Sequence, residues 1–188
     1  MNITHLDNAV VVRGHFGKEE LEAFVANQKT KQLVKSGIYN SKFQGVDGSV
    51  RNSMQVRINK TNPVVNKLRE CVETVNAEHL RINLSRVCDE NDFVEYNVNG
   101  KFEKHNDILW PSSALNHDKN PVRKTTTVVL LNDDFTGGKL ALWSKGNRYS
   151  FEFNPGDVIT FPSYVQHMVD PVESGVRYSL VSWSYGEF

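Results

Sequence analysis

Short β-prone runs dominate the second half of the chain and constrain its fold more than any other feature. From Arg81 onward, runs rich in Val, Ile, Thr, Tyr and Phe are separated by turn-forming residues such as Gly137-Gly138. The runs read RINLSRV, DFVEYNV, KTTTVVLL, KLALWS, RYSFEF, DVITFP, VQHMV and VRYSLVSW. Because such turns let consecutive strands pair antiparallel, the pattern predicts a mainly β (α+β) fold with its sandwich or barrel in residues 81–188.

The first eighty residues carry helical signals instead. Leu21, Phe24 and Val25 have helix-like spacing, and Asn62-Pro63 is a cap residue followed by proline at the first helical position. The apolar stripe of this second helix should lie against a sheet; it consists of Val64, Val65, Leu68, Val72 and Val75. Residues 36–53, rich in Gly, Ser and Asn, predict a long loop with at most a brief hairpin. Residues 1–80 are therefore expected to be helical support and loop.

Size and charge limit the class of protein. At 188 residues the chain fits one domain, residues 1–188. Its 22 Lys and Arg balance 22 Asp and Glu, so no charge excess indicates a nucleic acid partner. Cys71 and Cys88 form no Cys-x-x-Cys pair, which favours buried free thiols. Without a basic segment leading into a long apolar run, we expect a cytoplasmic protein with no membrane partner; the oligomeric state stays open.

Three residues form a candidate metal site. His105 and Asp107 are two positions apart, so they share a face if their segment is extended, and His167 lies in a second β-prone run. Two imidazoles and one carboxylate can occupy one face of Fe(II) and leave the other positions free for chemistry. From spacing alone, packing histidines and a chance aspartate explain the pattern equally well.

Arg177 suggests a bound anion next to this site. The turn-rich residues 170–175 predict a hairpin between the His167 and Arg177 segments, which would bring Arg177 near His167. Arg177 and Ser179 share a face of their strand, and that strand supplies no obvious acidic partner. Because a buried guanidinium needs an anion, we expect a ligand carboxylate to complete this part of the site.

The segment FVEYNVNGKFEKHND resembles a signature of the Fe(II)- and 2-oxoglutarate-dependent dioxygenases, specifically their prolyl 4-hydroxylase-like branch. The matching positions are Tyr96, Gly100, Phe102, His105 and Asp107. Downstream, TGGKLALW, NPGDVITFPS and HMVDPVESGVRYSLVSW are similar to further motifs of this family, so the resemblance covers residues 93–185. It implies a double-stranded β-helix, or jelly roll, with N-terminal helices buttressing one sheet.

The resemblance also implies roles for individual residues. His105, Asp107 and His167 would bind Fe(II), whereas Arg177 would bind the distal carboxylate of 2-oxoglutarate with help from Tyr96 and Ser179. Collagen-type members carry lysine where this chain has arginine; both are cations, so the co-substrate assignment stands.

The implied reaction is hydroxylation of a protein or peptide side chain, with proline the leading target. Dioxygen is consumed, 2-oxoglutarate is converted to succinate and CO2, and ascorbate is the expected reductant. Alternatives within catalysis are hydroxylation of a free amino acid or small molecule, and oxidative demethylation of nucleic acid, which the neutral charge disfavours. A non-enzymatic alternative is a jelly-roll module that binds a carboxylate through its metal.

Two residues are candidates for substrate contact. Trp110 could be an aromatic wall next to Asp107 or simply a packing residue. Arg51, with Arg57 and Lys60, could form a basic lip, although scattered charges usually form only a solvated face. The polar segment 111–124 either shapes the substrate entrance or is a surface connection.

Overall fold

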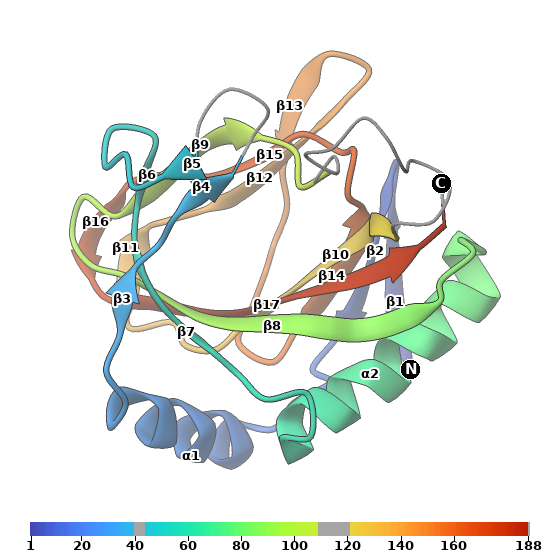
Figure 1. The fold of residues 1–188 in the computed structure, drawn as a ribbon, viewed down its shortest axis with the longest axis horizontal. Helices are drawn as coiled ribbons and strands as arrows, with labels where there is room; N and C mark the ends of the chain where they lie inside the picture. Colours follow the sequence, from blue (N-terminus) through green and yellow to red (C-terminus); the bar gives the residue numbers. More distant parts are fainter. Residues whose placement is uncertain (40–43, 109–120, 188) are drawn as a thin grey trace.

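Two facing antiparallel sheets form the body of the protein in the computed structural model, which describes residues 1–39, 44–108 and 121–187 (Figure 1). Within these residues the major sheet has eight strands, ordered β1 (Asn2–Leu6), β2 (Ala9–Arg13), β14 (Val158–Pro162), β10 (Val122–Leu130), β17 (Arg177–Gly186), β8 (Arg86–Tyr96), β7 (Met54–Arg57) and β3 (Val34–Lys35). The minor sheet is ordered β13 (Asn147–Ser150), β12 (Leu140–Ser144), β15 (His167–Val169), β9 (Lys101–His105) and β6 (Arg51–Asn52). This arrangement confirms the predicted jelly roll.

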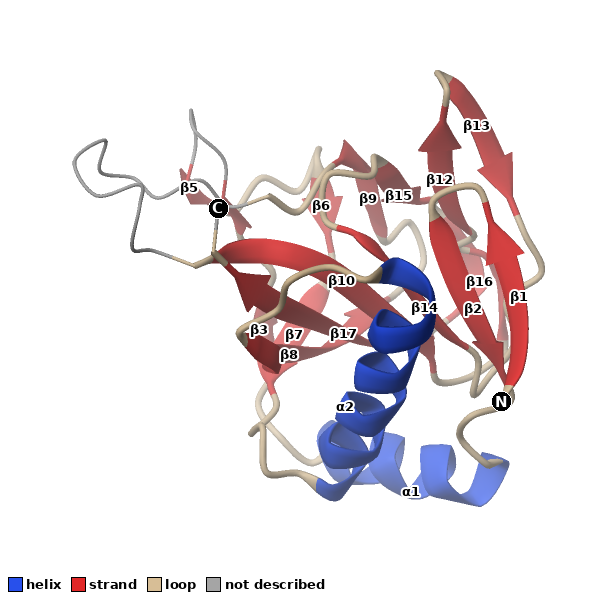
Figure 2. Ribbon diagram, turned by 90° about the vertical axis from the view of Figure 1, so that its right-hand side faces the viewer, coloured by secondary structure: helices blue, strands red, loops and turns tan. Residues whose placement is uncertain are grey.

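Two helices cover the face of the major sheet that is turned away from the minor sheet (Figure 2). They are α1 (Lys18–Lys29) and α2 (Pro63–Val75), close to the predicted positions, and α2 continues into a short π-helical turn, Asn76–Leu80. The Asn62 side chain caps α2 by accepting a hydrogen bond from the Val64 amide, 3.0 Å away. Among the described residues, no helix is long and apolar enough to cross a bilayer.

The central strands of the major sheet are buried on both faces because the outer face packs on the helices and the inner face on the minor sheet. In β2, Val10 and Val12 belong to the helix-side core, whereas Ala9 and Val11 belong to the core between the sheets. A strand buried on both faces has a continuous apolar sequence and not an alternating one. For this reason the prediction of a helical and loop region over residues 1–80 does not include β2. It also does not include β1 and β7, which are less buried but join the same sheet.

The connection between His167 and Arg177 differs from the prediction. The expected hairpin is wrong, because β15 pairs with β9 and β12 in the minor sheet, whereas β17 pairs with β8 and β10 in the major sheet. The intervening β16 (Val172–Gly175) pairs with β11 (Phe135–Gly137) while the chain crosses from one sheet to the other. Arg177 therefore reaches the site from the sheet opposite His167.

The loop predicted over residues 36–53 contains the brief hairpin, β4 (Ile38–Tyr39) paired with β5 (Gln44–Gly45), and ends in β6. The strand β6 pairs with β9, next to His105. Trp110 and most of the proposed entrance segment 111–124 lie outside the described residues.

Candidate active site

A cavity of about 460 Å³ lies between the two sheets. Its walls include the described residues that the sequence assigns to a metal, a co-substrate or a substrate, namely Arg51, Tyr96, His105, Asp107, His167, Arg177 and Ser179. Residues up to 128 positions apart in the chain, from Arg51 to Ser179, thus meet around one space.

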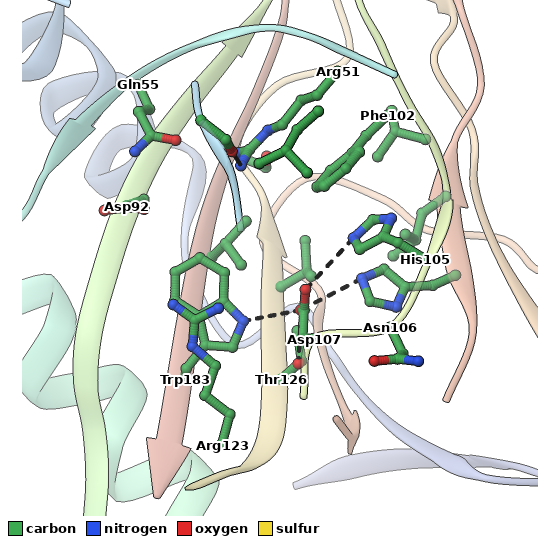
Figure 3. Close-up of a pocket in the computed structure, with 18 of the residues that line it drawn as sticks. Arg51, Gln55, Asp92, Phe102, His105, Asn106, Asp107, Arg123, Thr126 and Trp183 are labelled. Atoms are coloured by element: carbon green, nitrogen blue, oxygen red, sulfur yellow. Dashed lines mark hydrogen bonds and ion pairs between the residues drawn. The ribbon is translucent and has the colours of Figure 1, made fainter. Parts of the chain in front are cut away.

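The three candidate metal ligands converge at one point of this cavity, as Figure 3 shows for His105 and Asp107. His105 ends β9 and lies opposite His167, which begins β15. Asp107 lies beyond the end of the strand, where its amide donates to the Ser163 carbonyl over 2.9 Å. One ligand atom from each residue lies within 4.8 Å of the others. The cluster therefore has the size of a metal site.

Backbone carbonyls orient both imidazoles. His105 Nδ1 is 2.7 Å from the Glu103 carbonyl, and His167 Nδ1 is 3.0 Å from the Val165 carbonyl. A carbonyl only accepts, so each Nδ1 must carry the proton and each Nε2 keeps its lone pair in the neutral ring. Both Nε2 atoms lie 3.5 Å from a carboxylate oxygen of Asp107. This donor set fits Fe(II), because the two lone pairs and the carboxylate charge converge on the same point.

The charges of the cluster depend on one another. Burial disfavours the Asp107 carboxylate, but the adjacent His167 and His105 outweigh this effect and hold its pKa well below the usual range. Burial opposes protonation of His167, yet the Asp107 carboxylate raises the pKa of this histidine. Burial, and then the nearby His167, lower the pKa of His105. The cluster thus keeps an ionised carboxylate beside at least one neutral imidazole, as metal binding requires.

Arg177 also lines this cavity and is only 1% exposed. Its Nη1 donates to Ser179 Oγ over 3.1 Å and its guanidinium is 5.4 Å from the Tyr96 ring centre. Its Nε is buried without a hydrogen-bond partner, and none of the ion pairs among the described residues includes it. Burial lowers the pKa of Arg177. A buried cation in this state is suited to a carboxylate from a ligand.

Arg51 lines the cavity on the side of His105. Its guanidinium lies 4.6 Å from the Phe102 ring centre, and Phe102 in turn stacks on His105 with ring centres 3.5 Å apart. Arg57 and Lys60, by contrast, are paired with acids: Arg57 with Glu90 and Asp92, and Lys60 with Asp89. These ion pairs argue against a basic lip formed by all three residues. Arg51 therefore remains the one candidate of the three for substrate contact.

Sequence reasoning missed two residues that hold Asp107. Thr126 and Trp183 each donate a hydrogen bond of 2.9 Å to its Oδ2. Trp183 could have been found, because it follows Arg177 and Ser179 at even spacing on one strand and so faces the same way. Thr126 stands within a run of three threonines, and nothing in the sequence marks one of them.

The comparisons with known proteins agree with this geometry. Residues 92–185, half of the chain, match the family model of the 2OG-Fe(II) oxygenase superfamily. A PKHD-type hydroxylase of Synechococcus sp. (strain JA-2-3B'a(2-13)) is 31% identical over 74 residues, which are 37% of this chain and 33% of the relative. A PKHD-type hydroxylase of Colwellia psychrerythraea is 40% identical over 50 residues, 27% of this chain and 22% of the relative. The chain thus matches about a third or less of these two relatives.

Solved structures show the same fold. A prolyl-4-hydroxylase of Pseudomonas putida has a TM-score of 0.72 at 17% identity, covering 96% of this chain and 94% of that one. The viral collagen prolyl hydroxylase of Paramecium Bursaria Chlorella virus-1, solved with 2OG, has a TM-score of 0.71 at 16% identity, covering 96% and 97%. With the matching family model, the chain belongs to the 2OG-Fe(II) oxygenase superfamily.

Proposed function

We propose that this protein is an Fe(II)- and 2-oxoglutarate-dependent dioxygenase that hydroxylates a protein or peptide side chain, with proline the leading target. The observation that carries this proposal is the buried Arg177, which lacks an anionic partner and shares one cavity with His105, Asp107 and His167. A dicarboxylate fits this arrangement, because one end of it can bind a metal held by the cluster and the other carboxylate can pair with the Arg177 guanidinium.

Each side chain has a defined part in the proposal. His105, Asp107 and His167 hold Fe(II), and Arg177, Ser179 and Tyr96 bind the distal carboxylate of 2-oxoglutarate. When bound, the iron and co-substrate supply oxygen activation coupled to decarboxylation, which yields succinate and CO2. The protein orients the two groups and excludes water, since the Arg177 and Tyr96 side chains are almost completely buried. Ascorbate would keep the iron reduced.

The substrate is inferred from the relatives. Several are PKHD-type hydroxylases, and one structural neighbour is a prolyl hydroxylase of Trichoplax adhaerens in complex with a peptide fragment, with a TM-score of 0.70 at 16% identity. Arg51 is proposed to contact the substrate, because it lines the cavity beside Phe102 and His105. Trp110 stays a prediction for the same role.

The test measures 2-oxoglutarate turnover and product mass together. Protein supplied with Fe(II), ascorbate, 2-oxoglutarate and oxygen is incubated with proline-containing peptides and, in parallel, with free amino acids. We expect succinate formation and a peptide that gains one oxygen atom. His167→Ala should abolish both, whereas a plain carboxylate-binding module would keep most of its 2-oxoglutarate affinity through Arg177. If the native protein shows neither oxygen-dependent turnover nor metal-dependent binding of 2-oxoglutarate, the proposal is wrong.

A further inference from the structure

Two donors converge on the same oxygen of Asp107. The Trp183 indole N–H and the Thr126 hydroxyl each lie 2.9 Å from Oδ2, whereas Oδ1 points toward His105 Nε2 at 3.5 Å. Thr126 and Trp183 are direct partners on the neighbouring strands β10 and β17. The register of the major sheet therefore places both donors at one point, as Figure 3 shows.

The two donors use the bonding capacity of this oxygen. A carboxylate oxygen offers two lone-pair sites, and two donors at 2.9 Å are enough to use both. Oδ2 also lies 3.5 Å from His167 Nε2, so without these donors it would be near enough to share a metal with Oδ1. The hydrogen bonds thus distinguish two oxygens that are chemically equal in a free carboxylate.

The indole is itself held in place. The Arg123 guanidinium lies 4.0 Å from the centre of the Trp183 ring. Arg123 is anchored by an ion pair of 2.5 Å with Glu90 and by a hydrogen bond of 3.3 Å to the Tyr185 hydroxyl. A cation over the ring draws electron density from the indole and makes its N–H a stronger donor to a carboxylate.

We propose that Trp183 and Thr126 are positioning residues that reserve Oδ2 of Asp107 and present Oδ1 alone to the metal. This inference rests on the proposed function. Asp107 would then supply one ligand atom, and with His105 and His167 the protein would supply three to the ion. The remaining positions of a six-coordinate ion would be left to the co-substrates of the proposed function. A carboxylate bound through both oxygens would leave one position fewer.

The test compares variants in metal binding, with Mn(II) and Co(II) as probes. Trp183→Phe keeps the ring and removes the donor, and Thr126→Val keeps the shape and removes the hydroxyl. We expect each to weaken Mn(II) binding roughly tenfold, as loss of an orienting partner does at other metal sites. Each should also change the visible absorption bands of the Co(II)-loaded protein, because those bands report the number and arrangement of ligands.

Two controls complete the experiment. Trp143→Phe makes the same chemical change at an indole on β12, outside the residues that line this cavity, and should match the native protein. Thr126→Ser keeps the hydroxyl and should restore most of the affinity that Thr126→Val loses. If Trp183→Phe does not fold, the comparison of Thr126→Val with Thr126→Ser tests the inference by itself.

The possible failures are distinguishable. If Trp183→Phe and Thr126→Val both keep the native Mn(II) affinity and Co(II) spectrum, the inference is overturned and the metal centre stands. If the native protein binds neither ion at this site, the proposed function itself fails.

Discussion

Arg177 carries its charge inside the protein with one hydroxyl as its hydrogen-bond partner, and this is costly unless a ligand is bound. Arg177→Met should therefore abolish stabilisation by 2-oxoglutarate while leaving the ligand-free protein at least as stable as the native one. Thermal unfolding of Mn(II)-loaded protein with and without 2-oxoglutarate measures both effects. Arg148→Met removes a half-exposed arginine on β13 and is the control. A 2-oxoglutarate-dependent rise in Tm that survives in Arg177→Met would contradict this account.

Gly138 places the Arg177 side chain. A Cβ at this position would be 3.0 Å from Arg177 Cδ and 3.1 Å from Val172 Cγ2, and the backbone has a φ of +57°. Gly138→Ala should displace Arg177 and weaken 2-oxoglutarate binding roughly tenfold, the loss of one charge-assisted hydrogen bond. Mn(II) affinity should stay unchanged. Titration calorimetry with each ligand measures the two effects separately.

Gly146 provides the matched control. Its φ is +82°, but a Cβ there would meet nothing within 4 Å. Gly146→Ala should cost about 1–2 kcal/mol of stability through backbone strain alone, with native 2-oxoglutarate affinity. Equal loss of affinity in both variants would show that strain, and not the contact with Arg177, is responsible.

Residues of the candidate site could be predicted from the sequence only where the residue types and their order along the chain form a motif. His105, Asp107, His167 and Arg177 stand in a motif, and the cavity brings all four together. The roles of Thr126 and Trp183 depend on the register between β10 and β17, which a single sequence does not encode in a readable way. Arg51 was one of three similar cations, and only the ion pairs of the other two separate it from them.

At the scale of elements, α2 owes its start to one side chain. Asn62 satisfies the Val64 amide, and no acidic residue lies in the first turn to replace it. Asn62→Ala should lower the free energy of unfolding by about 1 kcal/mol, measured by urea denaturation. Asn62→Ser should retain most of the stability because serine is also a good cap. Equal losses in the two variants would show that Asn62 acts through something other than capping.

The elements themselves were predictable where periodicity was clear. The two helices and most strands of the second half follow from it, and the helix stripe does lie against a sheet. The crossing between His167 and Arg177 was mistaken for a hairpin because local turn residues indicate a reversal of the chain but not which sheet receives the next strand. Long-range pairing, here of β17 with β8 and β10, decides that.

At the scale of the whole molecule, burial of the thiols gives stability a pH dependence. Burial raises the pKa of Cys71 to about 12 and that of Cys88 to about 11, so both stay neutral in the folded protein at ordinary pH. In the unfolded chain they ionise near pH 8.5. The neutral thiols contribute fully to the free energy of unfolding below about pH 8.5. This contribution is lost as the pH rises from there toward the pKa values of the folded state, and the loss is about 2 kcal/mol per thiol by pH 10.

Urea denaturation at pH 8 and pH 10 tests this dependence. Cys71→Ala should lower stability at pH 8, because it leaves a cavity, but should show a smaller decrease between the two pH values than the native protein. An unchanged decrease would mean that other groups, such as Tyr185, cause it. At pH 8, iodoacetamide should label neither thiol until the protein is unfolded.

The imidazole orientation described above also affects how the protein tolerates mutation. Each ring is fixed by the carbonyl two residues earlier in the chain, and every amino acid has a carbonyl. Substitutions at Glu103 or Val165 that preserve the local backbone therefore leave the proton on Nδ1. The tautomers that the proposed metal site needs are therefore insensitive to side-chain substitution at these positions. The Asp107 carboxylate, which depends on the Thr126 and Trp183 side chains, is the proposed ligand most sensitive to mutation.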